Sequence, residues 1–147
     1  MNYNATTPFR ILIADDDEDD VQMTKECFID NKLAVDVNEV GDGQYLMDHL
    51  QSLKSTHGKD FPQLIILDLN MPRKNGLETL KELKEDNMLC RIPVVVFSTS
   101  KAPGDIEKAY ELGASCFVSK PNSLDEWCDK IAKLGKFWVE CVRVAPR

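Results

Sequence analysis

Residues 64–69 have the sequence LIILDL, in which four apolar residues precede Asp68 and a further leucine. An apolar run this short is typical of a strand that is buried on both faces, as the inner strands of a parallel sheet are. A carboxylate at the end of such a strand is costly to desolvate without a partner. The stretch therefore predicts a parallel-sheet protein in which Asp68 has a functional role.

Short apolar runs also lie on both sides of this strand, and stretches with helical spacing alternate with them. The further runs are residues 9–14, 34–40, 92–97 and 115–119. Alternating strands and helices are typical of an α/β fold with a mostly parallel sheet. We therefore expect a five-stranded parallel sheet flanked by five helices.

The length of 147 residues is typical of one domain. We expect that domain over residues 9–142, with tails at 1–8 and 143–147. The 25 acidic and 18 basic residues give a net charge of −7, which argues against direct binding to nucleic acid. No stretch approaches the ~20 apolar residues of a membrane span, and the first residues do not resemble a signal peptide. A cytoplasmic protein with no membrane partner is expected.

The cysteines are odd in number and scattered along the chain. They are Cys27, Cys90, Cys116, Cys128 and Cys141, and no two of them form a CxxC pair. This pattern indicates neither a disulfide framework nor a zinc site. We expect reduced thiols in an apolar core.

Polar residues follow the predicted strands at the points where those strands end. In open α/β sheets, ligands bind beyond the carboxyl ends of the strands, so these residues are informative. They are Asp15, Asp16 and Asp17 after the first strand, Asp68 and Asn70 after the third, Ser98 after the fourth and Lys120 after the fifth. Two carboxylates ~4 Å apart repel by roughly 4 kcal/mol at an effective dielectric near 20, so the cluster favours a divalent cation. Oxygen ligands of this kind suit Mg²⁺.

Each of these residues also has a simpler interpretation. Acidic residues in the first turn of a helix interact favourably with its dipole, so Asp17 to Asp20 are interpreted as helix-start residues exposed to solvent. Of the acidic residues after the first strand, only Asp15 and Asp16 are assigned to the metal. Ser98 alone would be an ordinary hydroxyl and Lys120 alone a surface lysine. Their coincidence at the strand ends is what indicates a site.

Four motifs resemble the receiver domains of bacterial response regulators, over nearly the whole chain from Phe9 to Val142. They are ILIADD at 11–16, LIILDLNMPRKNG at 64–76, PVVVFST at 93–99 and SCFVSKP at 115–121. The resemblance implies a doubly wound, flavodoxin-like fold with strand order 2-1-3-4-5. It also implies a stand-alone response regulator of a two-component phosphorelay, which accepts a phosphoryl group from a histidine kinase and signals through a changed protein-binding surface.

The resemblance assigns a role to each site residue. It implies that Asp68 is the phosphoacceptor and also faces the metal, that Asp16 binds Mg²⁺ directly and that Asp15 assists through water. Asn70 would offer its backbone carbonyl to the metal.

Further roles concern the phosphoryl group and the switch. The resemblance implies that Ser98, with Thr99 beside it, contacts the phosphoryl group, and that Lys120 pairs with its oxygens. Pro121 is expected to follow a cis peptide bond. Phe117 departs from the tyrosine that the family often has there, so a switch that uses a phenolic hydroxyl at this position is excluded. A switch in which the aromatic ring of Phe117 changes its position stays open.

A narrower likeness concerns the partners. The long loop before the third strand and the helix ending in FWVECV resemble small regulators that partner phytochrome-type histidine kinases. Apolar positions on the last helix that we expect to be exposed, such as Trp138 and Val142, are compatible with a homodimer, and the sequence leaves open whether one forms. The downstream partner would be a protein or a phosphotransfer component.

Three rival interpretations remain to be compared with a receiver. A phosphohydrolase with an aspartyl-phosphate intermediate usually needs an aspartate two residues after the nucleophile, where this chain has Asn70. A flavodoxin-like cofactor carrier would need a phosphate-binding loop, whereas residues 15–20 would repel phosphate. A degenerate receiver is disfavoured because every expected site residue is present. We therefore expect no enzyme activity beyond the chain's own phosphorylation and dephosphorylation.

Overall fold

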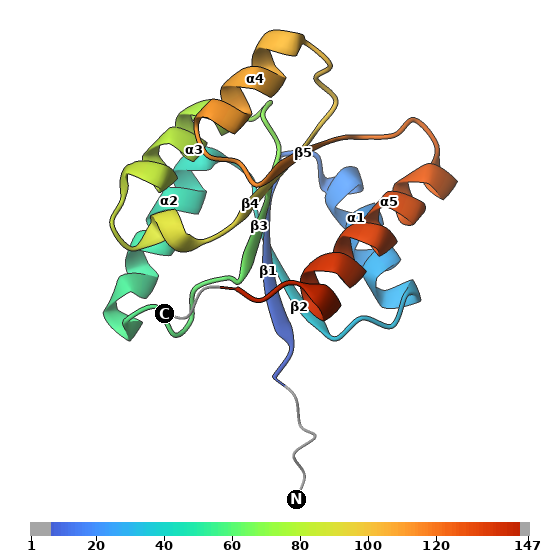
Figure 1. Ribbon diagram of the computed structural model, residues 1–147, viewed down its shortest axis with the longest axis horizontal. Helices are drawn as coiled ribbons and strands as arrows, with labels where there is room; N and C mark the ends of the chain where they lie inside the picture. The colour runs from blue at the N-terminus through green and yellow to red at the C-terminus, as the bar shows by residue number, and fades with distance from the viewer. Residues whose placement is uncertain (1–6, 145–147) are drawn as a thin grey trace, which may run out of the picture.

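The computed structural model describes residues 7–144, which form one parallel sheet with helices on both sides (Figure 1). Its strands are β1 (Phe9–Ala14), β2 (Val35–Val40), β3 (Leu64–Leu67), β4 (Val94–Ser98) and β5 (Cys116–Ser119). All of the strand pairs are parallel, and the order is β2-β1-β3-β4-β5. The predicted fold class and strand order are confirmed.

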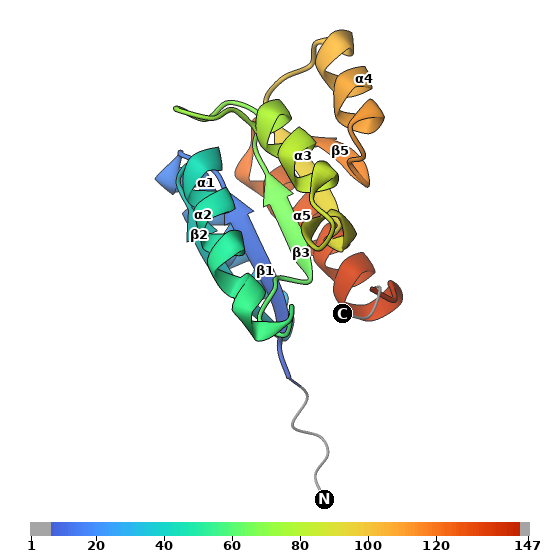
Figure 2. The ribbon, with the colours of Figure 1, turned by 90° about the vertical axis from the view of Figure 1, so that its left-hand side faces the viewer.

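The helices form the two outer layers. They are α1 (Glu18–Asp30) and α5 (Leu124–Lys136) on one side, and α2 (Gly43–Ser52), α3 (Gly76–Glu85) and α4 (Pro103–Glu111) on the other (Figures 1 and 2). Two short 3₁₀ helices, Leu53–Thr56 and Leu89–Arg91, precede β3 and β4. Within residues 7–144, no helix is both long enough and apolar enough to cross a membrane.

Burial follows the position of each strand in the sheet. Every residue of β3 and β4 is buried, as expected for inner strands that have helices on both faces. In the edge strand β2, partly buried and exposed residues alternate over the first four positions. The core is divided by the sheet into a cluster that includes Leu46 and Leu80 and a second cluster that includes Phe28 and Trp127. These two layers hold the carboxyl ends of the inner strands in fixed positions.

Capping residues determine where the helices begin. Asp17 is the N-cap of α1, and its carboxylate accepts hydrogen bonds from the backbone N–H groups of Asp19 and Asp20. The predicted helix-start role of Asp17 is therefore confirmed. Asn75 and Glu78 form a capping box at the start of α3.

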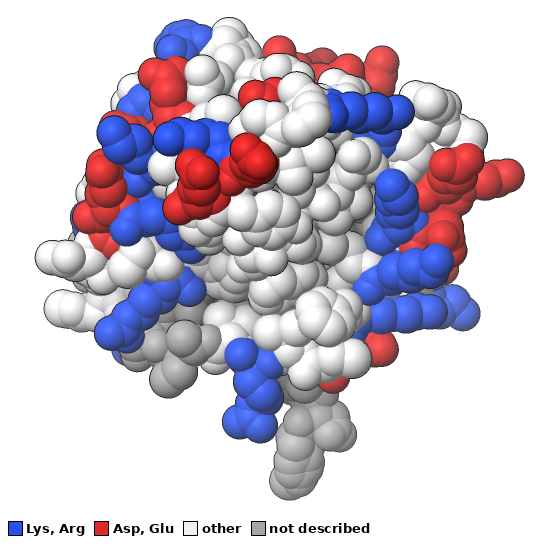
Figure 3. Space-filling view, turned by 45° about the horizontal axis from the view of Figure 1, so that its top comes forward, with Lys and Arg blue, Asp and Glu red and all other residues white. Residues whose placement is uncertain are grey.

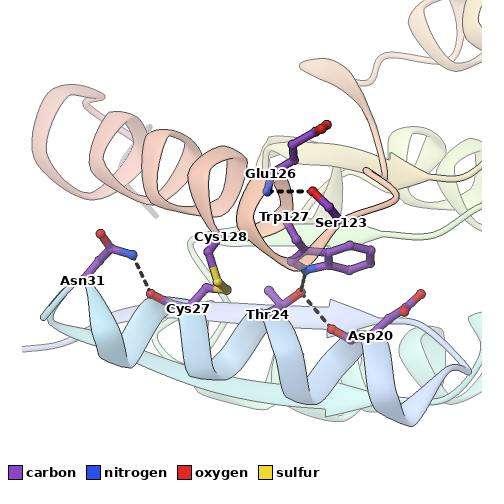
Figure 4. Close-up of a disulfide and its surroundings, with 8 residues drawn as sticks. All are labelled: Asp20, Thr24, Cys27, Asn31, Ser123, Glu126, Trp127 and Cys128. Atoms are coloured by element: carbon purple, nitrogen blue, oxygen red, sulfur yellow. Dashed lines mark hydrogen bonds between the residues drawn. A yellow bond between two sulfur atoms is a disulfide. The ribbon is translucent and has the colours of Figure 1, made fainter.

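A disulfide between Cys27 of α1 and Cys128 of α5 joins the two helices on one side of the sheet (Figure 4). The expectation of reduced thiols is wrong for this pair. The two cysteines are 101 positions apart in the sequence, and only the packing of α1 against α5 brings their Cα atoms to 5.1 Å. Such a contact leaves no local sequence pattern. Cys90, Cys116 and Cys141 are free, as expected, but the expected core position is wrong for Cys141, which is exposed, while Cys90 and Cys116 are partly buried.

The chain after α5 continues as one short π-helical segment. Residues Phe137–Cys141 form a π-helix, closed by a hydrogen bond from the Val142 N–H to the Phe137 carbonyl. Trp138 is buried, so the expectation that it is exposed is wrong, whereas Phe137 is 55% exposed. Trp138 lies seven residues after the buried Ile131, so it continues the buried face of α5. A homodimer stays a prediction that Trp138 does not support.

Candidate functional site

Three aspartates meet at the carboxyl edge of the sheet. Asp15 and Asp16 follow β1, and Asp68 follows β3, the neighbouring strand. One carboxylate oxygen from each lies within 4.8 Å of the other two. Asp15 and Asp68 are buried, whereas Asp16 is exposed. The predicted acidic cluster is therefore assembled, with one face open to solvent.

The backbone around Asp68 is held on two sides. Its N–H donates a 2.9 Å hydrogen bond to the carbonyl of Ala14. On the other side, a Cβ on Gly76 would lie only 2.3 Å from the Asp68 carbonyl oxygen, so only glycine allows α3 to begin this close. Among the described residues, Asp68 Oδ1 is the one buried side-chain oxygen or nitrogen without a hydrogen-bond partner. An orphan oxygen of this kind indicates a site for an incoming ligand.

Lys120 lies at the centre of the site, buried at the end of β5. Its Nζ is 2.7 Å from Asp15 Oδ2, 2.8 Å from Asp20 Oδ2 and 3.4 Å from Asp68 Oδ2. Burial alone would lower the pKa of Lys120, but hydrogen bonds to Asp15 and Asp20 and the charge of Asp68 raise it well above its usual value. The lysine therefore stays charged and neutralises part of the cluster.

Asp15 has an unusual protonation equilibrium. Burial raises the pKa of the Asp15 carboxyl to about 6, although hydrogen bonds from Lys120 and from the Asp17 N–H oppose that effect. The negative charge of Asp68 also raises it. A cation beside these carboxylates would favour the ionised form.

The donor set fits a hard divalent cation. Carboxylate oxygens from Asp15, Asp16 and Asp68 are close enough to share one ion, and the described part of the cluster contains no histidine or cysteine. Asn70 is exposed two residues beyond Asp68. The role of its backbone carbonyl stays a prediction.

The predicted phosphate-contacting residues lie at the ends of β4 and β5. Ser98 is completely buried, and its hydroxyl accepts a 3.2 Å hydrogen bond from the Ser100 N–H. The Lys120 N–H donates to the Ser98 carbonyl over 2.8 Å, which ties the two residues together. Thr99 is exposed next to them. Ser98 and Lys120 thus lie side by side at the carboxyl edge of the sheet, as expected.

The expectation of a cis bond before Pro121 is wrong. Residues 7–144 contain no cis peptide bond, so the bond between Lys120 and Pro121 is trans. The trans form is favoured by about 0.5–1 kcal/mol before proline. Here the Lys120 side chain reaches the carboxylates with a trans bond.

The backbone at Phe117 has a partner that the sequence did not reveal. Phe117 lies in β5 and is partly buried against the core. Its N–H donates a 3.1 Å hydrogen bond to the hydroxyl of Tyr110 in α4. A phenolic hydroxyl therefore does contact this position, although it comes from another residue.

Asp20 is the site residue that sequence reasoning missed. We interpreted it as exposed helix-start charge, but its carboxylate is bound to Lys120. It lies in the first turn of α1, directly after the acidic residues at the end of β1, and that position was the available signal. The identity of its partner depends on how α1 packs beside the end of β5.

A second missed group supports the loop after Asp68. Asp42, the N-cap of α2, is buried and accepts a 2.8 Å hydrogen bond from Arg73 Nε. The guanidinium of Arg73 lies 4.3 Å from the centre of the Tyr45 ring. Burial alone would raise the pKa of Asp42, but the Tyr45 N–H and Arg73 lower it. This contact anchors the segment between β3 and α3 to α2.

This arrangement can carry out one kind of chemistry. Asp68 offers a carboxylate oxygen as a nucleophile, the acidic cluster can hold a cation, and Lys120 supplies a positive charge. These are the components required for transfer of a phosphoryl group to an aspartate.

Comparisons with known proteins agree with this chemistry. A model of the response regulator receiver domain matches residues 11–132. The response regulator Rcp1 of Synechocystis sp. (strain PCC 6803) is 32% identical over 142 residues, which cover 97% of this chain and 97% of that protein. The probable methanogenesis regulatory protein FilR2 of Methanothrix harundinacea is 27% identical, over 92% of this chain and 86% of its own.

Solved structures give the same result. The phosphorylated cyanobacterial phytochrome response regulator RcpA has a TM-score of 0.87 and 32% identity, covering 95% of this chain and 99% of its own. The Mn²⁺-bound form of response regulator Rcp1 has a TM-score of 0.82 and 32% identity, covering 95% of this chain and 100% of its own. With the family match over most of its length, the chain belongs to the response regulator receiver domain family.

Proposed function

We propose that Asp68 is the phosphoacceptor of this response regulator, that Mg²⁺ bound by Asp15, Asp16, Asp68 and the Asn70 carbonyl assists the transfer, and that the donor is a phosphohistidine of a histidine kinase. The observation that carries the proposal is the buried, unpartnered Oδ1 of Asp68 beside Lys120 and two further aspartates. The domain is proposed to span residues 9–142, slightly more than the 11–132 of the family match.

The transfer requires a nucleophile and neutralisation of charge. A carboxylate oxygen of Asp68 attacks phosphorus, the phosphorus–nitrogen bond of the donor breaks, and its electron pair stays on the histidine nitrogen. The bound cation supplies neutralisation of the phosphoryl oxygens. Lys120, 3.4 Å from Asp68 Oδ2, pairs with those oxygens, and the Ser98 hydroxyl contacts the group once it is attached. Water can later cleave the acyl phosphate formed.

The charge pattern on one face of the molecule favours a protein as partner. On the side seen when the top of Figure 1 comes forward, acidic and basic side chains surround an area that carries neither (Figure 3). That side has no continuous basic footprint, and the net charge is −7. The donor is proposed to be a phytochrome-type kinase in the cytoplasm, because the relatives include a phytochrome response regulator.

Incubation with acetyl phosphate and Mg²⁺, followed by intact mass, tests the proposal. The native protein should gain one phosphoryl group that mild base removes, and Asp68→Asn should gain none. Asp60→Asn, which changes an exposed aspartate in the loop before β3, is the matched control and should behave like the native protein. An adduct that survives base, or one that persists in Asp68→Asn, would contradict the assignment.

A further inference from the structure

The ammonium of Lys120 is shared unequally among three carboxylates. Its Nζ lies 2.7 Å from Asp15 Oδ2 and 2.8 Å from Asp20 Oδ2, but 3.4 Å from Asp68 Oδ2. Asp15 and Asp68 belong to the acidic cluster, whereas Asp20 comes from α1 and is outside it. The lysine is thus closest to two carboxylates other than the proposed phosphoacceptor.

We propose that Asp20 is a positioning residue that draws Lys120 away from Asp68 before phosphorylation and releases it afterwards. The inference rests on the proposed function of Asp68. A phosphoryl group on Asp68 places about two negative charges beside Nζ in place of the single charge of the free carboxylate. The phosphoryl oxygens and Asp20 then compete for the same ammonium.

Solvent exposure distinguishes Asp20 from the other partners of Lys120. The side chain of Asp20 is 19% exposed, against 6% for Asp15 and 7% for Asp68. A carboxylate that loses its ion pair with the Lys120 ammonium must be hydrated by water instead. Burial hinders that hydration and makes the loss costly. Asp20 is therefore the carboxylate that gives up Lys120 most readily.

The backbone of Asp20 is fixed, so the exchange needs only side-chain motion. Its N–H donates to the Asp17 carboxylate, and its carbonyl accepts a 2.9 Å hydrogen bond from the Thr24 hydroxyl. That hydroxyl in turn accepts from Trp127 Nε1 of α5 (Figure 4). Helix α1 can therefore stay in place while Lys120 turns from Asp20 towards the phosphoryl oxygens.

Asp20→Asn tests the inference, because it removes the competing charge and keeps the shape of the side chain. With Mg²⁺ saturating, the affinity for beryllofluoride, a mimic of the phosphoryl group, should rise about tenfold, as expected when a charge-assisted hydrogen bond no longer competes. The rate of phosphorylation by acetyl phosphate should rise in the same direction. The affinity for Mg²⁺ alone should match that of the control variant below.

The control is Asp19→Asn, which makes the same charge change in the same turn of α1 on a side chain that is exposed. It should leave the beryllofluoride affinity at the native value. Asp20→Glu keeps the carboxylate and should return the affinity towards that value. If thermal unfolding shows that Asp20→Asn is not folded, Asp20→Ser takes its place, because it removes the charge with a smaller side chain.

The outcomes separate this inference from the proposed function. If the native protein does not bind beryllofluoride, the proposed site at Asp68 is wrong. If the native protein binds it but Asp20→Asn binds no more tightly than Asp19→Asn, the site is retained and Asp20 does not restrain Lys120. Weaker binding by Asp20→Asn would also overturn the inference, because Asp20 would then support the active position of the lysine.

Discussion

The indole Nε1 of Trp127 in α5 donates a 3.0 Å hydrogen bond to the hydroxyl of Thr24 in α1. Both side chains are buried, and the bond lies beside the disulfide that joins the same two helices (Figure 4). The hydroxyl also donates to the carbonyl of Asp20, so it connects α5 to the turn of α1 that contacts Lys120.

Thr24→Val should destabilise the protein by about 1–3 kcal/mol, because it leaves the buried indole N–H without an acceptor. The free energy of unfolding in urea measures the effect. Thr24→Ser keeps the hydroxyl and is the control, with a smaller loss from the missing methyl group. Equal stabilities of the valine and native proteins would show that this hydrogen bond contributes nothing.

Reduction of the disulfide between Cys27 and Cys128 should lower the free energy of unfolding by about 2–4 kcal/mol, since the bond closes a long loop of the unfolded chain. Denaturation with and without dithiothreitol measures it. Cys90→Ser, which changes a free thiol, should keep the dependence on dithiothreitol. A thiol titration in denaturant should find three reactive thiols before reduction, and five would show that this bond is not formed.

Asp86→Asn should lower the free energy of unfolding at neutral pH, and the difference from the native protein should shrink in acid. Burial alone would raise the pKa of Asp86, but Lys54 and the N–H groups of Leu89 and Met88 lower it from 3.8 to about 2. A carboxyl group with a lowered pKa stabilises the folded state at pH values above its pKa in the unfolded chain, which is 3.8. This stabilisation is lost as the pH falls through the folded-state pKa of about 2. By linkage the difference is at most about 2 kcal/mol at pH 6 and roughly half of that at pH 3.

Urea unfolding of the native and Asp86→Asn proteins at pH 6, 4 and 3 checks this prediction. Asp60→Asn serves as the control for loss of an exposed aspartate. A difference that stays constant over this range would exclude titration of Asp86 as its source.

Gly76→Ala should impair phosphorylation as well as stability. The added Cβ would meet the Asp68 carbonyl at 2.3 Å and the Leu69 Cα at 2.6 Å, both of which are backbone atoms. We expect a loss of several kcal/mol in unfolding free energy and a much slower reaction with acetyl phosphate. Gly104→Ala, where no atom lies within 4 Å of the new Cβ, should leave phosphorylation unchanged.

Local patterns were sufficient to predict the strands and the residues at their ends. The apolar run before Asp68 marks a buried strand, and parallel strands bring their carboxyl ends to one edge, so Asp15, Asp16, Asp68 and Lys120 could be grouped from sequence. That prediction needed no knowledge of how the helices pack.

The features that were missed depend on packing between distant segments. Asp20 binds Lys120 across 100 positions, and Cys27 and Cys128 pair across 101. Arg73 reaches Asp42 because α2 lies beside the loop after β3. The cis bond before Pro121 was expected from resemblance alone, and no property of the local sequence required it.

The hydrogen bond from the Phe117 N–H to Tyr110 also affects how other chains can approach the sheet. β5 is an edge strand, paired only with β4 in the described structure, and unpaired N–H groups on an edge can accept an additional strand. Tyr110 occupies one of these groups with a side-chain hydroxyl. A partner that extended the sheet at β5 would first have to displace that tyrosine, so this border is protected against intermolecular strand pairing and aggregation.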